Sequence, residues 1–171
     1  MLFMHNHLMS SVRTRKAPPP PCPEAAPAPA VDAVDTRFLR SLAGYNTRRA
    51  SLAIIEVFME RMAVYDLKVV DFSVLSLVAH NPGVTSRQLC AALNVLPPNL
   101  VGLIAALERR GLIERRPHPS DGRAMGVHLT PEGVALTQQA EKTAAQLEQD
   151  ATSRLTAAER KTLIRLLQKI Y

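Results

Sequence analysis

Two helix signals lie three residues apart near the middle of the chain, and this spacing limits the possible folds more than any other feature. Thr85 and Gln88 have the spacing of a capping box, in which each side chain binds a backbone N–H that the helix leaves free. Asn94 suits the turn that ends this helix, and Pro97 suits the first turn of the next one. The sequence therefore predicts a helix-turn-helix, whose second helix typically enters the DNA major groove.

The second helix is expected to run from Pro97 to about Arg110, because Gly111 is typical of the position just past a helix end. Its apolar stripe consists of Leu100, Leu103, Ile104 and Leu107. Its outward face is small and nearly uncharged, and consists of Pro98, Asn99, Val101, Gly102 and Ala105. A surface helix that meets only water usually carries charged residues there, so this face is expected to lie against a partner.

The residues after Gly111 change from a helical to an extended pattern. Segments 112–116 and 125–130 are predicted to pair as a hairpin with its tip at 117–123, where Asp121-Gly122 is a strong turn signal. A hairpin beside a helix-turn-helix is a wing. Its positive charge comes from Arg115, Arg116 and Arg123. A guanidinium at the tip can enter the minor groove, and Asp121 is expected to pair with Arg123 and hold it extended. The alternative is that this arginine cluster, which also includes Arg109 and Arg110 at the end of the preceding helix, forms a solvated face.

Several short motifs follow one another in a fixed order. They are Leu107-Glu108-x-x-Gly111-Leu112-Ile113-x-Arg115, Pro119-x-Asp121-x-Arg123-Ala124 and Leu129-Thr130-Pro131-x-Gly133, with Gly44-Tyr45-x-x-Arg48-Arg49-Ala50 and Phe72-x-Val74-Leu75 upstream. Over roughly residues 35–171, this order resembles the MarR-type winged-helix transcriptional regulators. The resemblance implies a dimer that binds an operator and is often released by a small aromatic ligand. Many relatives carry Arg or another polar residue where this chain has Gly102, so base readout is expected to rest on Asn99 and on the backbone around Pro97 and Pro98.

Long apolar helices are predicted on both sides of this region. One begins near Asp35 and continues past Phe58 to Met62, a second covers about 70–79, and two more cover about 131–149 and 157–170. They carry more apolar residues than one copy can bury, which indicates a homodimer on a pseudo-palindromic DNA site. The predicted fold is mainly α: a winged helix-turn-helix with a two- to three-stranded wing and long N- and C-terminal dimerisation helices. Residues 1–34 are predicted to be a disordered proline-rich extension of a domain at 35–171, with its DNA-binding head at 70–130 and dimerisation helices at 35–64 and 131–171.

The composition of the chain favours the same class of protein. The net charge of +6 and the pI of about 9.8 favour a polyanionic partner. Cys22 and Cys90 make no disulfide framework, so a reducing cytoplasm is the simplest expectation. The sequence has no apolar run long enough to cross a bilayer, and no cofactor, metal site or catalytic motif is predicted.

The candidate site residues form two groups. Arg87 is expected to contact phosphate, whereas Asn99 either reads adenine or serves only as a helix-start residue. The resemblance also implies a ligand pocket near Tyr45, Arg48, Arg49 and His80, where an arginine would suit a carboxylate. The competing interpretation is a winged-helix module that binds another protein, which the apolar outward face of the second helix also favours.

Overall fold

The computed structural model describes residues 34–118 and 121–171, without the side chains of residues 118 and 121–123. The chain divides into Met1–Asp35 and Thr36–Tyr171, and the helices and strands of the described residues all belong to the second unit. The predicted proline-rich extension lies almost entirely outside the described residues. The elements in chain order are α1 (Arg37–Arg40), α2 (Ala43–Met62), η1 (Ala63–Tyr65), α3 (Val69–His80), β1 (Val84–Thr85), α4 (Ser86–Leu93), α5 (Pro97–Arg109), β2 (Ile113–His118), β3 (Asp121–Leu129), α6 (Pro131–Ala151) and α7 (Ala157–Leu167).

The N-terminal helical segment is broken, so the prediction of one continuous helix from Asp35 to Met62 is wrong. The Ser41 hydroxyl donates to the carbonyl of Phe38 at 2.7 Å. The Asn46 amide donates to the carbonyls of Arg40 and Leu42, both at 2.8 Å. The carbonyl of Phe38 also accepts from the backbone N–H of Ser41 at 3.1 Å, and that of Leu42 from the backbone N–H of Asn46 at 3.2 Å, so the side chains add to the turn that separates the two helices. Leu42 is extended, and α2 starts at the next residue.

The predicted helix-turn-helix is confirmed. The capping box forms, since the backbone N–H of Gln88 donates to Thr85 Oγ1 at 3.4 Å and that of Thr85 donates to Gln88 Oε1 at 2.9 Å. Asn94 ends α4 in the left-handed region, with φ of 50°, and Pro97 is the first residue of α5. The two helices meet at a bend of 114°. Among the described helices no single one is long and apolar enough to span a membrane, although α4 and α5 taken together across this bend meet that test.

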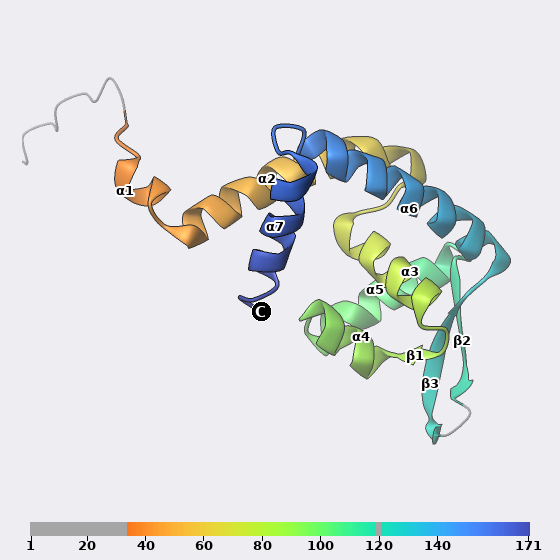
Figure 1. Ribbon diagram of the computed structural model, residues 1–171. Coiled ribbons are helices and arrows are strands. Elements are labelled where there is room, and N and C mark those ends of the chain that lie inside the picture. The colour runs from red at the N-terminus through yellow and green to blue at the C-terminus, as the bar shows by residue number, and fades with distance from the viewer. Residues whose placement is uncertain (1–33, 119–120) are drawn as a thin grey trace, which may run out of the picture. The chain divides into compact units, whose positions relative to one another are not determined.

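The wing is a three-stranded antiparallel sheet of order β1-β3-β2, in which β2 and β3 form a long hairpin (Figure 1). Arg115 lies opposite Val127, and the pairing continues past Pro117 with an irregularity before His118. The hairpin is therefore longer than predicted. Asp121 and Gly122 belong to β3. The prediction that Asp-Gly forms the turn at the tip is wrong, because ladder pairing extends beyond it.

The buried core connects the helix-turn-helix to the flanking helices. Its apolar residues come from α2 to α6, from β2 and β3, and from two loops: Phe58, Met62, Leu67, Val74, Leu75, Val78, Leu89, Leu100, Ile104, Leu107, Leu112, Ile113, Val127, Ala140 and Leu147. Phe58 of α2 packs edge-on against Phe72 of α3, with ring centroids 5.7 Å apart. The structure is the predicted mainly α winged helix-turn-helix. Because α5 points Leu100, Ile104 and Leu107 into this core, its opposite face stays at the surface.

Candidate nucleic-acid interface

The outward face of α5 is exposed, smooth and uncharged. Pro97, Pro98, Asn99 and Gly102 are all exposed, and Val101 keeps 63% of its surface. A Cβ atom added at Gly102 would meet no atom within 4 Å. The helix backbone can therefore approach a partner closely at this position. Asn99 is the one side chain of this face that can both donate and accept hydrogen bonds, as base readout requires.

Arg87 lies in the first turn of α4, next to the capped end of that helix, and its side chain is exposed. The Thr85–Gln88 capping box fixes the position of this turn. A cation held at such a point is suited to a phosphate of the DNA backbone, which adds affinity without sequence information. The phosphate contact of Arg87 stays a prediction.

Two arginines of the wing have acidic partners that the sequence did not reveal. Arg115 forms a bidentate ion pair with Glu108, in which Nε donates to Oε1 at 2.8 Å and Nη2 donates to Oε2 at 2.6 Å. Hydrogen bonds from Arg115, aided by its charge and opposed by desolvation, lower the pKa of Glu108, and the same contacts raise the pKa of Arg115. Arg116 pairs with Glu114. Arg115 therefore joins the wing to the end of α5, and its charge is already compensated.

The wing tip holds the remaining predicted DNA contacts. The backbones of Asp121 and Arg123 lie in β3, but their side chains are outside the described part of the protein. Their pairing, and the entry of Arg123 into the minor groove, stay predictions.

Arg109 and Arg110 end α5, and they differ although they are neighbours. Arg109 lies in the last turn of the helix and is exposed. Arg110 is exposed as well, but its guanidinium donates to the carbonyls of Asp66 at 2.7 Å and Tyr65 at 2.9 Å. The arginine cluster is thus neither one continuous DNA-binding patch nor merely a solvated face. Arg110, Arg115 and Arg116 have internal partners, whereas Arg109 is exposed.

The predicted ligand residues separate into two places. Tyr45 and Arg49 line a cavity of about 390 Å³ together with Arg40 and Asn46. Arg48 is not among the residues that line it. His80 ends α3, where its Nε2 lies 3.0 Å from Glu141 Oε1, the same oxygen that accepts a 2.7 Å hydrogen bond from Ser76. The sequence missed Arg40 and Asn46, because the break between α1 and α2 that brings them to this cavity leaves no trace in the apolar spacing.

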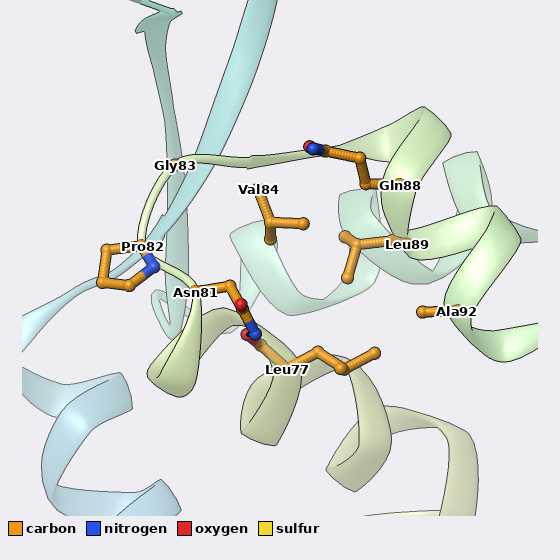
Figure 2. Close-up of a pocket in the computed structure, with 8 residues that line it drawn as sticks. All are labelled: Leu77, Asn81, Pro82, Gly83, Val84, Gln88, Leu89 and Ala92. Carbon is orange, nitrogen blue, oxygen red and sulfur yellow. Dashed lines mark hydrogen bonds between the residues drawn. The ribbon is translucent and has the colours of Figure 1, made fainter.

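A second cavity, of about 490 Å³, lies between the end of α3, the loop and strand β1 that follow it, and one side of α4 (Figure 2). Its lining consists of Leu77, Asn81, Pro82, Gly83, Val84, Gln88, Leu89 and Ala92. None of these side chains is charged, and Gln88 Oε1 already accepts hydrogen bonds from Thr85. This cleft lacks a cation that would bind a carboxylate, so the cavity at Tyr45 suits an aromatic acid better.

An apolar groove of about 490 Å³ runs between α2 and α7. Its lining includes Ile54 and Ile55 of α2 and Leu163, Leu166 and Ile170 at the C-terminal end. Several of these side chains are exposed in the single chain, and Ile170 keeps 72% of its surface. A contiguous apolar surface of this kind is typical of an interface. Within residues 34–118 and 121–171, no group of three His, Cys, Asp or Glu side chains could hold a metal ion.

Comparison with known proteins identifies relatives over most of the chain. The sequence profile of the MarR family matches residues 65–124. A protein of Thauera aromatica, whose name assigns it to transcriptional regulation of the hcr operon, is 33% identical over 129 residues, which cover 75% of this chain and 78% of that protein. The multiple antibiotic resistance protein MarR of Salmonella typhimurium is 37% identical over 106 residues, which cover 61% of this chain and 74% of the relative.

Solved structures of transcriptional regulators also match most of this chain. The transcriptional repressor CouR, bound to a 23-mer DNA duplex, matches with a TM-score of 0.76 and 35% identity over 81% of this chain and 98% of its own. The MarR family protein Rv2887 of Mycobacterium tuberculosis, in complex with salicylic acid, matches with a TM-score of 0.62 and 25% identity over 76% of this chain and 96% of its own.

Proposed function

Because this chain belongs to the MarR family of transcriptional regulators, we propose that it is a homodimeric repressor that binds a pseudo-palindromic operator and is released by a small aromatic carboxylate. The observation that carries the proposal is the outward face of α5. This face is exposed, and α5 follows the capped helix α4 across a bend of 114°. Asn99 lies on it beside small residues such as Gly102, which would allow the bases of DNA to come close to the helix. Binding of operator DNA would take place in the cytoplasm.

Each part of the head has a distinct role in this proposal. Asn99 would form a bidentate hydrogen bond to adenine, and Val101 would contact a thymine methyl group. Arg87 and the wing tip would bind phosphates and the adjacent minor groove. One head covers only part of a site, so specific binding needs two heads on half-sites about 34 Å apart.

The groove between α2 and α7 supports the homodimer. A second copy of the chain would cover the exposed apolar side chains of both helices, and the two-fold symmetry of such a pair matches a palindromic site. The alternative occupant is an unrelated protein, which would make the chain a protein-binding adaptor.

The cavity beside Tyr45 supports the ligand. Arg40 and Arg49 provide guanidinium groups for a carboxylate, and the Tyr45 ring provides an aromatic surface beside them. One solved relative carries salicylic acid, which has this chemistry. The cavity lies at the start of α2, so a ligand there would act on the helix that is proposed to hold the two copies together, and through it on the distance between the heads.

The test starts from genomic DNA fragments that the full chain selects. Binding to a selected fragment should weaken by orders of magnitude between low and moderately high salt, because several phosphate contacts release counterions. Arg87→Ala should reduce the slope of log affinity against log salt by about one. Asn99→Ala should mainly relax the preference at one base pair. Salt-independent binding, or equal loss on every sequence from Asn99→Ala, would favour the adaptor or a purely structural Asn99.

Salicylate is the probe for the ligand. It should release the fragment from the wild-type protein and release it less readily from Arg49→Ala. An equal effect on both proteins would argue against the cavity beside Tyr45.

A further inference from the structure

We propose that Arg110 is a positioning residue for DNA recognition. It fastens the end of α5 to the end of the α2–η1 segment, and so fixes the direction of the DNA-reading helix relative to the helix that joins the two copies. This inference rests on the proposed function and names a part of its mechanism.

The evidence is a pair of charge-assisted hydrogen bonds between segments far apart in the sequence. Nη1 of Arg110 donates to the carbonyl of Asp66 at 2.7 Å, and Nη2 donates to the carbonyl of Tyr65 at 2.9 Å. The carboxylate of Asp66 is farther away, at 3.9 Å, and it is 97% exposed. The guanidinium therefore recognises two backbone carbonyls, and the ion pair contributes little.

These carbonyls need donors because a helical segment ends there. Asp66 follows η1 with φ of 50° and ψ of 47°, in the left-handed region, and reverses the chain toward the buried Leu67. The last carbonyls of such a segment have no N–H partner within it, and they carry the negative end of its dipole. A guanidinium fork satisfies both carbonyls at once, which a lysine ammonium does not do in the same geometry.

The same contacts make Arg110 a poor phosphate ligand. Two of its nitrogens are engaged, and its side chain keeps only 30% of its surface, against 58% for Arg116 on the wing. Tyr65 is itself held, since its hydroxyl lies 2.9 Å from Thr143 Oγ1 on α6. The clamp thus connects α5, η1 and α6 at one point, the point where the DNA-binding head meets the long helices.

A clamp at this point matters only when two heads bind one duplex. A single head can rotate to fit its own half-site, whatever its angle to α2. In a dimer, both heads must match the spacing of the two half-sites. If α5 can change its angle to α2, the second head is less often in position to bind once the first is bound, so the affinity gained from the second half-site falls. Loss of Arg110 should therefore weaken binding to two half-sites while sparing binding to one.

The experiment measures the affinity of the full chain for two duplexes, the complete selected operator and a version with one half-site scrambled. Arg110→Ala and Arg110→Lys should each reduce the ratio of the two affinities by about tenfold, with an unchanged salt slope. Arg109→Ala is the matched control, and it should lower both affinities and reduce the salt slope, leaving their ratio intact. Asp66→Asn should behave as wild type, because the carbonyl and not the carboxylate accepts the guanidinium.

Wild-type ratios in Arg110→Lys, together with a reduced salt slope in Arg110→Ala, would overturn the inference and make Arg110 a phosphate contact. Thermal unfolding of each variant at the same concentration separates a loss of fold from a loss of position. If Arg110→Ala does not fold, Arg110→Lys, which keeps the charge and most of the stem, decides alone. A wild-type protein that binds no duplex would instead refute the proposed function.

Discussion

Replacing Gly102 with alanine should stabilise the free protein and weaken its complex with DNA. Glycine inside a helix costs about 1 kcal/mol relative to alanine, because it loses more backbone freedom on folding. Nothing opposes this gain in the free protein, since the added Cβ would meet no atom within 4 Å. The melting temperature should therefore rise by roughly 3 to 5 °C. On the operator the methyl group would hold the helix away from the bases, and the affinity should fall by about tenfold, or ~1.4 kcal/mol.

Gly133→Ala is the matched comparison, because it makes the same chemical change in another helix. There the added Cβ would lie 1.9 Å from the carbonyl oxygen of Leu112 and 2.9 Å from its carbonyl carbon. These are backbone atoms between α5 and β2, and they cannot rotate away. The clash should destabilise the fold by roughly 3 kcal/mol, at the upper end of overpacking costs. The same glycine-to-alanine change should therefore raise the stability of the fold at position 102 and lower it at position 133.

Urea unfolding followed by circular dichroism, at one fixed protein concentration, measures both stabilities, and fluorescence anisotropy measures affinity for a labelled operator. The reasoning about α5 is refuted if Gly102→Ala binds the operator as tightly as wild type. A loss of stability in Gly102→Ala would refute the structural premise that its surroundings are open.

Three further outcomes are expected from other contacts of the protein. The hydrogen bonds from Arg115 lower the pKa of Glu108, so wild type should be more stable than Glu108→Gln at pH values above the ordinary carboxyl pKa of about 4.3. This difference in unfolding free energy should disappear as the pH falls through the lowered pKa, which urea unfolding at a series of pH values measures. Thr85→Ala removes the cap of α4 and should cost about 1 kcal/mol of unfolding free energy in the same assay. Ile55→Asp should abolish the proposed dimer in sedimentation velocity, whereas Val134→Asp, exposed on α6 outside the groove, should not.

The parts of the fold that the sequence predicted correctly depend on neighbours along the chain. A capping box, a left-handed Asn94 and a proline at the first helical position each act within four residues, so their effect can be deduced without tertiary structure. The apolar spacing of α5 likewise identified its inner face, since Leu100, Ile104 and Leu107 are buried and Leu103 is partly buried against the core.

The parts that the sequence did not predict depend on distant or competing partners. Arg110 and Tyr65 are 45 residues apart, and no local pattern joins them. The pairing of Arg115 with Glu108 was also not predicted, although the two residues are only seven positions apart. An acid near the end of a helix faces the strand that returns beside it, and this is the sequence signal that could have indicated the pair. At the break before α2, the Asn46 side-chain amide donates to the carbonyls of Arg40 and Leu42, and the apolar spacing of the sequence carries no sign of these contacts.

The sparse outward face of α5 has a consequence for the promoters that such a protein could control. A surface with one amide and several methyl or methylene groups discriminates only modestly at each base pair, because an apolar contact tells thymine from its alternatives by little. Most of the selectivity would then come from two half-sites of low sequence specificity that lie at the correct distance from each other. Regulated promoters are expected to tolerate substitutions at many positions and to lose control when a single base pair is inserted between the two halves.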